Sequence, residues 1–302
     1  MLGAGIAGLT AALEGARAGK RIHLVERSDR LGGYAGRIYK MLPSGADSSG
    51  LKEPDMQVLV NEVMEHPGIE VHLETSLESI SGEPGNFIVS LENNKSSELH
   101  VGAVVTATGW KPYNKEKLSY MGYGSERVKT LEEFELYVQE ALPPDRVLFI
   151  LCAGSRDENH LPYCSAYCCS AALKQALYVR ELNPNAEVYI IYRDIRTSGF
   201  QEEFYKMVQS DDAIFMTRGV VDSVSENGDV VEVTLSDSLL EDEIRISSDM
   251  VVLASGMVPN TTADLNLQYR LGPGLPEIEY DFSDSHFICF PYETRRTGIY
   301  TC

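Results

Sequence analysis

Residues 3–8 read Gly3-Ala4-Gly5-Ile6-Ala7-Gly8, and this stretch decides the fold. Its three glycines match the Gly-x-Gly-x-x-Gly turn of dinucleotide-binding units, where they permit a tight turn, close approach of a pyrophosphate and helix–strand packing. An alanine-rich helix follows to about Gly19, and then the strand Arg21-Ile22-His23-Leu24-Val25. Glu26 lies 18 residues beyond Gly8, a spacing typical of the carboxylate that accepts a ribose hydroxyl. The pattern predicts an α/β fold built on a Rossmann-like β-α-β unit.

A second pair of glycines, Gly32-Gly33, follows the acid and indicates which nucleotide is bound. Flavoproteins of the glutathione-reductase type show such a pair, so FAD is favoured over NAD, and Arg37 is a candidate to neutralise a phosphate. The alternative is that these two glycines only make a turn. Small residues end the buried strand at 104–110, where the backbone is expected to pass close to the cofactor. The predicted FAD-binding residues are Gly3, Gly5, Ile6, Ala7, Gly8, Glu26, Arg27, Gly32, Gly33, Arg37, Ile80, Ala107, Thr108 and Gly109.

The first sheet is predicted to be incomplete. Only Met1 and Leu2 precede the glycines, where a buried strand of several residues is expected. At the other end the chain stops at Cys302, just after a Gly-Ile-Tyr segment that leads into a flavin-binding loop in related flavoproteins. We therefore expect a chain truncated at both ends, either a fragment or the product of a gene model that starts late.

A second decisive stretch follows the apolar strand at 147–151. It holds four of the six cysteines, Cys152, Cys164, Cys168 and Cys169. A helix at about 165–182 and a strand at 188–192 come next, which makes another β-α-β unit. The cysteines therefore stand where a nucleotide-binding turn is expected, and Gly154 is the only glycine there.

The spacing of these cysteines favours a metal or redox site. Cys164 and Cys168 are four residues apart, so one helical face presents both, and Cys169 lies in the same turn. Four thiolates at a helix N-terminus suit an iron–sulfur cluster, because cysteine supplies all the ligands and the helix dipole offsets negative charge. The alternatives are inert or chance-clustered thiols, and a redox dithiol or vicinal disulfide beside a flavin. Zinc is less favoured because Cys152 lacks a partner two to four residues away.

Composition narrows the class of protein. The chain has 302 residues with 43 % hydrophobic content, enough for ordinary cores in two domains. No apolar run approaches the roughly 20 residues of a membrane span, and no signal peptide opens the chain, so we expect a soluble, cytoplasmic protein. A net charge of −19 argues against nucleic acid and anionic membranes as partners.

The domain organisation follows from two buried strands that end in small residues, at 104–110 and 250–259. They imply two nested Rossmann-like dinucleotide-binding domains of the thioredoxin reductase or glutathione reductase type. Strands at 70–73, 87–91 and 99–101 are expected to form a small meander, and Pro143-Pro144 is taken as a hinge. The predicted domains are the first part of an FAD-binding domain at 1–143, an inserted NAD-domain-like module with the cysteines at 144–258, and the return segment of the FAD-binding domain at 259–302.

These residues carry a resemblance to a known family. The chain resembles the A subunit of heterodisulfide reductases, and more closely a shorter relative, the A subunit of the quinone-interacting membrane-bound oxidoreductase of sulfate reducers. The resemblance covers essentially the whole chain. It rests on Gly3 to Gly8, Leu31 to Gly33, Cys152 to Asp157, Tyr163 to Ser165 with Cys168 and Cys169, Lys174 to Ala176, Asp194 to Arg196, and Glu293 to Tyr300.

The resemblance implies an FAD-containing core that passes electrons between FAD and iron–sulfur centres of partner subunits, some of them membrane-bound, with a homodimer as a further option. It implies that Cys152, Cys164, Cys168 and Cys169 ligate a [4Fe-4S] cluster. It also implies that Lys174 lies near the flavin, where a cation stabilises the reduced, anionic form. From residue type alone, a solvated helix lysine is the favoured interpretation of Lys174.

The leading hypothesis is an FAD-dependent electron-transfer subunit in sulfur or sulfate energy metabolism. The alternative is an NAD(P)H-dependent disulfide oxidoreductase with a cysteine dithiol, which the missing second glycine fingerprint disfavours. A third hypothesis is a fragment that binds no cofactor. The loop at 42–50 lacks the cysteines of long family members, and there is no Cys-x-x-Cys-x-x-Cys run, which argues against flavin-based electron bifurcation. Cys289 and Cys302 lack spaced partners and stay unassigned.

Overall fold

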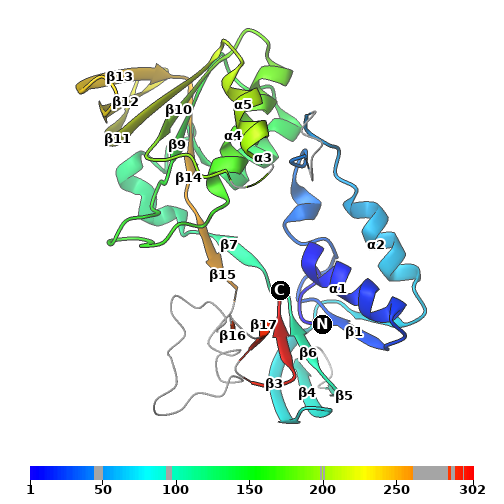
Figure 1. Cartoon of the computed structure of the whole chain (residues 1–302). Helices are drawn as coiled ribbons and strands as arrows, with labels where there is room; N and C mark the ends of the chain where they lie inside the picture. Colours follow the sequence, from blue (N-terminus) through cyan, green and yellow to red (C-terminus); the bar gives the residue numbers. More distant parts are fainter. Residues whose placement is uncertain are drawn as a thin grey trace. The chain divides into compact units, whose positions relative to one another are not determined.

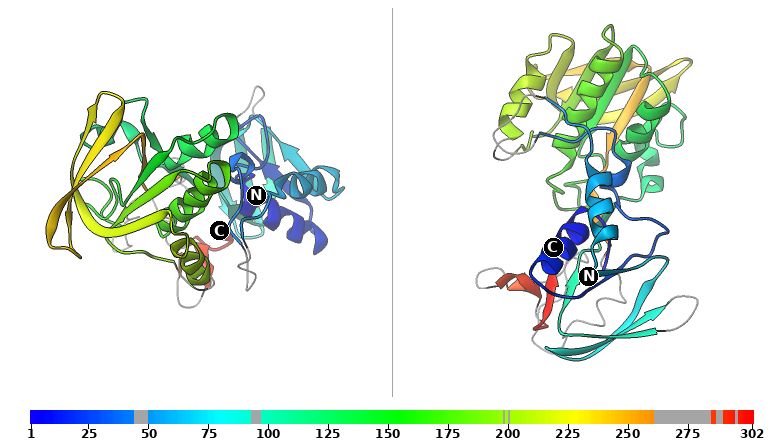
Figure 2. Two further views of the ribbon diagram at one scale, coloured as in Figure 1. Left: turned by 90° about the horizontal axis from the view of Figure 1, so that it is seen from above. Right: turned by 90° about the vertical axis from the view of Figure 1, so that its right-hand side faces the viewer.

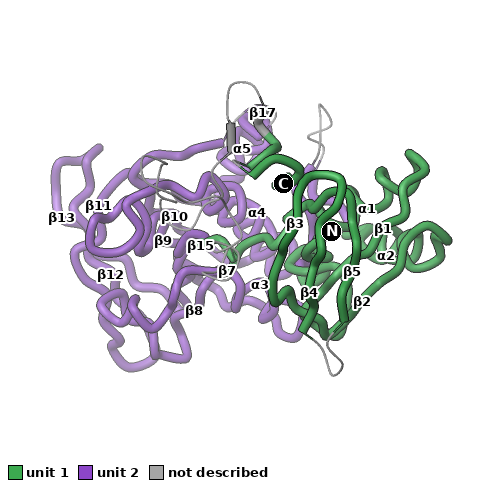
Figure 3. Tube along the Cα trace, turned by 90° about the horizontal axis from the view of Figure 1, so that it is seen from below, with its two compact units in different colours: residues 1–37, 54–111, 258–302 green, residues 38–53, 112–257 purple. Residues whose placement is uncertain are grey.

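The computed structural model divides into two compact units, shown in different colours in Figure 3. Unit 1 comprises Met1–Arg37, Pro54–Lys111 and Val258–Cys302, and unit 2 comprises Ile38–Glu53 and Pro112–Met257. The structure describes residues 1–43, 50–92, 97–197, 199, 201–260, 285–286, 290–294 and 296–302. Part of the 42–50 loop, most of the segment after Pro259, and Cys289 lie outside the described residues. None of the helices in these described ranges is both long and apolar enough to cross a membrane.

The sheet of unit 1 is parallel and is joined at its centre by the first residues of the chain. Strand β1 (Ile22–Val25) pairs with β2 (Ile69–His72), and β6 (Val104–Thr106) pairs with β18 (Ile299–Thr301). Leu2 forms parallel bridges to β1 and to β6. The sequence predicted that the centre of this sheet is lost. Of that central strand the structure has Met1 to Gly3, whose backbone is hydrogen-bonded to Val25 on one side and to Val105 and Ala107 on the other.

Two helices cover one face of this sheet (Figure 1). Helix α1 (Ile6–Arg17) and helix α2 (Met56–Glu65) bury Leu9, Met56 and Val63 together with Leu24 of β1. Both helices carry apolar residues at helical spacing, and burial of that stripe stabilises them where propensity alone does not. The short helix η1 (Ala35–Arg37) and the antiparallel strands β16 (Ser285–His286) and β17 (Phe290–Thr294) complete this part of the unit.

An antiparallel meander also belongs to unit 1, but its strands differ from those predicted. It consists of β3 (Ser76–Glu83), β4 (Asn86–Glu92) and β5 (Ser97–Val101). The predicted first strand, at 70–73, instead extends the parallel sheet as β2. Strand β3 was missed because its sequence, Ser-Leu-Glu-Ser-Ile-Ser-Gly-Glu, is mostly polar and only one of its residues, Ile80, is buried.

Unit 2 is a seven-stranded sheet covered by helices, in the strand order β13-β12-β11-β10-β9-β14-β8. Strands β8, β14, β9, β10 and β11 run parallel, and β11, β12 and β13 form an antiparallel ribbon that is visible in yellow and gold in Figure 2. The strands are β8 (Val128–Thr130), β9 (Arg146–Leu151), β10 (Glu187–Tyr192), β11 (Ile214–Asn227), β12 (Val230–Asp237), β13 (Asp242–Ser248) and β14 (Met250–Ala254). The helices are η2 (Lys115–Met121), α3 (Leu131–Glu140), α4 (Cys168–Leu182) and α5 (Gln201–Gln209).

The predicted β-α-β unit is present as β9-α4-β10, because β9 and β10 pair in parallel on either side of the helix in sequence. The core of unit 2 lies between the helices and the sheet, where Phe134 of α3, Tyr178 of α4 and Phe204 of α5 are fully buried. Apolar side chains from β9, β14 and β10 supply the other side of this core. The helix that follows the cysteines is therefore fixed along its length by packing.

The structure groups the residues before Pro143-Pro144 differently from the predicted hinge. Strand β8 pairs in parallel with β14, and α3 packs Phe134 and Val138 into the core of unit 2. Residues 112–143 and 38–53 therefore belong to the same unit as the cysteines. Strand β8 is three residues long, too short for a period-two pattern to reveal it in the sequence.

The two buried strands predicted at 104–110 and 250–259 are each interrupted by small residues. The first becomes β6 and β7 (Trp110–Pro112), separated by Ala107-Thr108-Gly109. The second becomes β14 and β15 (Met257–Pro259), separated by Ser255-Gly256. Strands β7 and β15 pair with each other, and the boundary between the two units falls within them.

Candidate functional site

The glycine turn of unit 1 gives each glycine a different physical role. Gly3 has φ +96°, and a Cβ there would lie 2.3 Å from the carbonyl oxygen of Ala107. A Cβ at Gly8 would lie 1.9 Å from the carbonyl oxygen of Gly3. At Gly5 an added Cβ would meet nothing within 4 Å. The first and third glycines therefore serve the turn and the packing, whereas the second leaves open space that a ligand can approach.

That open space lies at the start of helix α1. Gly5 is the N-cap residue, and no side chain caps the helix. Ile6 and Ala7, the first two helical residues, are exposed. Uncapped N–H groups at a helix N-terminus carry partial positive charge and favour phosphate. The residues present fit a dinucleotide pyrophosphate.

Glu26 follows β1 and its carboxylate is held in place by three hydrogen bonds. The Ala4 N–H donates to Oε2 at 2.8 Å, and the Ser28 N–H and hydroxyl donate to Oε1 at 2.9 and 2.8 Å. A carboxylate has further lone pairs, so these bonds orient it without consuming its capacity to accept from a ribose hydroxyl. Arg27, the next predicted residue, is exposed.

The pair Gly32-Gly33 packs directly on the glycine turn. Both have positive φ, +106° and +55°, and the Gly32 N–H donates to the carbonyl of Ala4 at 2.8 Å. A Cβ at Gly33 would lie 2.9 Å from Cα of Gly5. An ordinary surface turn would not need this approach, so the pair forms part of the same cradle. Arg37 ends helix η1 and is exposed.

The small residues after β6 lie on the other side of the turn. Ala107 is buried against Gly3, and the side-chain amide of Asn260 donates to the carbonyl of Thr108 at 3.0 Å. The Asn260 N–H donates to the carbonyl of Gly109 at 2.9 Å. The side chain of Ile80, which was predicted near the adenine, is buried in a core of unit 1.

In unit 2 the four cysteines occupy the turn between β9 and α4. Cys152 comes directly after β9, and Cys168 and Cys169 are the first two residues of α4. Three non-glycine residues in this loop have left-handed backbone: Cys152 (φ +59°), Arg156 (φ +56°) and Ala166 (φ +52°). Each such residue costs about 1–3 kcal/mol and persists only where the surroundings impose it. The conformation of this loop is therefore fixed by the residues that surround it.

The four thiols lie close enough to influence one another's charge. Burial raises the pKa of Cys168 to about 12, and the other three thiols add to that rise. Burial is also the largest cause of the raised pKa of Cys152 and of Cys169, and Cys164 adds to both. A reactive cysteine needs a lowered pKa, so Cys152, Cys168 and Cys169 in their free form are poor nucleophiles.

Each of the four sulfurs has a hydrogen-bond donor beside it. In addition, Nη1 of Arg156 is buried and has no hydrogen-bond partner among the described residues. Hydrogen bonds to sulfur are one of the means by which proteins tune iron–sulfur centres. The donors are the Arg156 guanidinium for Cys152, the Ala166 N–H for Cys164 at 3.4 Å, the Gly256 N–H for Cys168 and the Arg196 N–H for Cys169.

Lys174 lies on α4 and is not a solvated lysine. Its side chain is 4 % exposed and its ammonium donates to Glu135 Oε1 and to the carbonyl of Lys40, both at 3.0 Å. Glu135 also accepts from Gln175 and from the Tyr178 hydroxyl, at 2.7 and 2.9 Å. Burial lowers the pKa of Lys174 in spite of the carboxylate. The interpretation of Lys174 as a solvated residue is therefore wrong.

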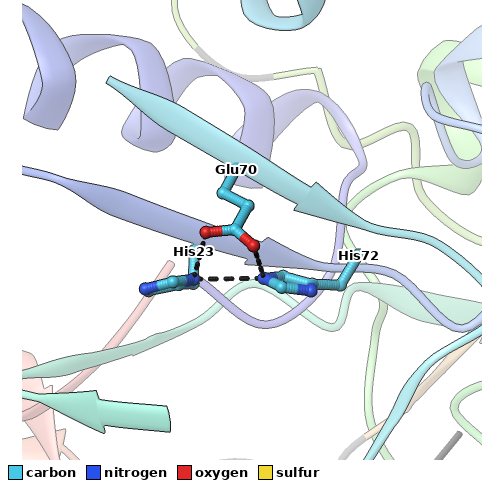
Figure 4. Close-up of side chains that lie close together, drawn as sticks. All are labelled: His23, Glu70 and His72. Atoms are coloured by element: carbon cyan, nitrogen blue, oxygen red, sulfur yellow. Dashed lines mark hydrogen bonds and ion pairs between the residues drawn. The ribbon is translucent and has the colours of Figure 1, made fainter. Parts of the chain in front are cut away.

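One group of side chains was not singled out in the sequence. His23, Glu70 and His72 place three potential metal-binding atoms within 4.8 Å of one another (Figure 4). The sequence treats His72 as an ordinary strand residue. The signal that would have found the group is the Glu-x-His spacing on β2, which puts both side chains on one face opposite a histidine of β1.

Known proteins match this chain along its whole length. The family described as NAD(P)-binding Rossmann-like domain matches residues 2–40. The chain is 28 % identical over 99 % of its length to the A subunit of the H2/formate:CoB-CoM heterodisulfide,ferredoxin reductase of Methanococcus maripaludis. It is 25 % identical over 99 % of its length to an iron-sulfur A subunit of the CoB–CoM heterodisulfide reductase of Methanopyrus kandleri. The chain is a relative of these heterodisulfide reductase A subunits.

The match to the heterodisulfide reductase A subunits covers part of those proteins, because the chain spans 59 % of the length of both. Among solved structures, the thioredoxin reductase of T. acidophilum is similar with a TM-score of 0.65 and 18 % identity, over 100 % of this chain and 87 % of that one. This likeness confirms the predicted fold class, a thioredoxin-reductase-like arrangement of Rossmann-type units.

Proposed function

We propose that the chain is an FAD-dependent oxidoreductase subunit that relays electrons between a flavin in unit 1 and a [4Fe-4S] cluster in unit 2. Gly3, Gly5, Gly8, Glu26 and the Gly32-Gly33 pair would hold the FAD. Cys152, Cys164, Cys168 and Cys169 would ligate the cluster. The flavin would supply two-electron chemistry and the cluster one-electron steps.

The observation that carries this proposal is the chemistry of the cysteine turn. The other thiols add to the raised pKa of Cys168, and the buried Nη1 of Arg156 is left for an acceptor that the described residues do not supply. A mononuclear zinc site fits less well. At a Zn–S distance of about 2.3 Å, tetrahedral thiolates stand roughly 3.8 Å apart. In the described part of the chain, the group of three donor atoms that approaches this spacing contains no cysteine.

Among the described residues of unit 2, no glycine turn like that of unit 1 is present to hold a pyridine nucleotide. The turn between β9 and α4 runs from Cys152 to Tyr167, and a Cβ at Gly154 would lie 2.8 Å from the side chain of Leu118. Gly154 therefore packs against protein and does not open onto a phosphate, unlike Gly5. This disfavours the second candidate, an NAD(P)H-dependent disulfide oxidoreductase that uses two of the cysteines as a dithiol.

Lys174 would act as a positioning or electrostatic residue toward the flavin, as the family resemblance implies. It donates two hydrogen bonds, and an ammonium has three donors. A Lys174→Met substitution is expected to lower the midpoint potential of the flavin, because a cation stabilises the reduced, anionic form. An unchanged potential in a folded variant would assign Lys174 to the stability of unit 2 alone.

The partners proposed are iron–sulfur and membrane-bound subunits of a heterodisulfide reductase-like or quinone-interacting complex in sulfur metabolism, reached from the cytoplasmic side. The relatives' names support the heterodisulfide reductase-like part of this proposal, since both describe the A subunit of a heterodisulfide reductase, and one of them calls it an iron-sulfur subunit.

The test is anaerobic purification followed by iron, sulfide and flavin analysis and low-temperature EPR of the dithionite-reduced protein. We expect about four iron and four sulfide per chain together with one FAD. Flavin without iron, combined with NADH-dependent reduction of a disulfide, would support the dithiol enzyme instead. A folded chain that binds neither group would support the third hypothesis, a fragment without a cofactor.

A further inference from the structure

The side chains of His23, Glu70 and His72 converge on one face of the parallel pair β1 and β2 (Figure 4). Successive side chains of a strand point to opposite faces, so Glu70 and His72 share a face. His23 is the register partner of Glu70 across the ladder, which adds the third side chain to it. The opposite face is apolar and packs Leu24 and Val71 with the helices α1 and α2.

The spacing of the donor atoms matches a metal coordination shell. His23 Nδ1 lies 3.1 Å from His72 Nε2 and 3.4 Å from one oxygen of Glu70. His72 Nε2 lies 3.8 Å from the other oxygen. Zinc takes histidine nitrogen and carboxylate oxygen at about 2.0–2.1 Å, which in a tetrahedron puts neighbouring donors roughly 3.3 Å apart. The three measured separations fall on both sides of that value.

The burial of the three side chains leaves one side of the group open. His23 and His72 are 29 and 19 % exposed, whereas Glu70 is 67 % exposed. Two half-buried imidazoles fix the site to the sheet, and the exposed carboxylate leaves a position for water. The negative charge of Glu70 also offsets the positive charge of Arg21 near His23.

We propose that His23, Glu70 and His72 form a binding site for a divalent first-row transition metal ion, with water in the remaining position. Two imidazoles and one carboxylate are ligands that zinc and its neighbours accept. The site lies within unit 1 and uses none of the predicted FAD or cluster ligands. Its effect is to clip β2 to β1, because the three ligands come from both strands.

The test uses Zn²⁺ with the flavin- and cluster-loaded protein, so that the four cysteines are already occupied. Isothermal titration is expected to show one Zn²⁺ per chain bound in the micromolar range, with a rise in Tm. Zinc X-ray absorption is expected to show nitrogen and oxygen at about 2.0–2.1 Å and no sulfur at about 2.3 Å.

Two variants and a control locate the ion. His72→Gln is expected to abolish the binding. Glu70→Gln should leave the fold intact, because the Glu70 side chain is exposed, and is expected to weaken zinc binding. The loss should be at least the roughly 10- to 100-fold that follows when a metal ligand loses its hydrogen-bond partner. His100→Gln, at an exposed histidine of β5, is the matched control and is expected to bind as the unmodified protein does.

Three results would overturn the proposal. One is the absence of zinc binding at millimolar concentration in the unmodified protein. Another is equal binding by the unmodified protein and by Glu70→Gln and His72→Gln. The third is a sulfur shell in the absorption spectrum, which would place the ion at cysteine.

Discussion

The glycine turn of unit 1 and the cysteine turn of unit 2 occupy the same position in two β-α-β units but achieve opposite results. Between Leu2 and helix α1 the chain needs only Gly3 to Gly5, and the absence of side chains leaves space at Gly5. Between β9 and α4 the chain uses a long loop with three strained non-glycine residues to bring thiols together. The scaffold offers a helix N-terminus in both places, and the turn decides whether phosphate or sulfur is presented to it.

Helix α3 has a side-chain cap at its N-terminus, which helices α1 and α4 lack. Helix α3 begins with a full capping box, in which Thr130 accepts from the Glu133 N–H and Glu133 accepts from the Thr130 N–H. Helices α1 and α4 begin at Gly5 and Tyr167 without a side-chain cap. A cap of this kind is worth about 1 kcal/mol, so α1 and α4 forgo stability that a bound group would return.

The largest effect is expected from the removal of one of the four thiols in the cysteine turn. We expect Cys168→Ser to reduce iron and sulfide from about four each per chain to near zero while FAD stays bound, because all four ligands come from cysteine. Metal analysis and EPR measure the loss. Cys302→Ser, at an exposed thiol outside the turn, is the matched control and should keep full iron content. Equal loss in both variants would contradict the assignment.

The corresponding test in unit 1 distinguishes a glycine that leaves room for FAD, Gly5, from a glycine that the packing of the turn requires, Gly8. Gly5→Ala is expected to fold with a stability within about 0.5 kcal/mol of the unmodified protein, since its Cβ meets no protein atom within 4 Å, yet to lose FAD at least tenfold in affinity. Gly8→Ala should instead cost about 1–3 kcal/mol or more, because its Cβ would lie 1.9 Å from a carbonyl oxygen. Flavin titration and urea denaturation give the two readouts. Unchanged FAD affinity in Gly5→Ala would place the cofactor elsewhere.

A further test concerns the stability of unit 2, in the helix that follows the cysteine turn. Lys174→Met leaves the 3 % exposed carboxylate of Glu135 without its cation, and we expect a loss of about 3–5 kcal/mol in the free energy of unfolding. The double variant Lys174→Met with Glu135→Gln should recover part of it, because the amide oxygen still accepts from the Tyr39 N–H and the Tyr178 hydroxyl, while the Gln175 amide has to turn to accept from the new NH2 group. Chemical denaturation measures both. No recovery in the double variant would show that packing, and not charge, is lost.

The smallest effect concerns the capped helix. Burial alone would raise the pKa of Glu133, but hydrogen bonds from Lys115, the Thr130 N–H and Tyr123 lower it below its ordinary value. The folded protein therefore binds fewer protons than the unfolded chain between the two values. The stabilisation, about 1 kcal/mol or less, is present above the ordinary glutamate pKa of 4.5 and is lost as the pH falls through the lowered value. Denaturation between pH 3 and 6 should show that the free energy of unfolding falls less steeply with falling pH in Glu133→Gln than in the unmodified protein. An identical slope would assign the pH dependence to other carboxylates.

The sequence predicted the fold because its strongest signals are local. The glycine motif, the strand at 188–192 and the strand at 147–151 each depend on residues close in the chain, and the structure has all three. Strands β3 and β8 were missed because one is mostly polar and the other is three residues long. Their pairing is decided by neighbours more than 30 residues away or by a meander turn, which a short window does not contain.

The candidate sites divide in the same way. Residues such as Gly5 and the cysteines could be singled out, because their chemistry and spacing are visible in one stretch. The burial of Lys174 could not, because it depends on Glu135, which is 39 residues earlier in the chain. His23 and His72 are 49 residues apart and meet only through the register of β1 and β2. A pairwise contact across a parallel ladder has no signature in either strand alone.

The order of the units along the chain sets the order of events during synthesis. All of unit 2 has been synthesised by Met257, whereas β18 (Ile299–Thr301), which pairs with β6 in the sheet of unit 1, is synthesised later. The interval from Met257 to Ile299 takes about 2–8 s at translation rates of about 5–20 residues per second. The chain segments that carry the four cysteines are thus complete first, so the proposed cluster could be assembled before the proposed FAD domain is complete.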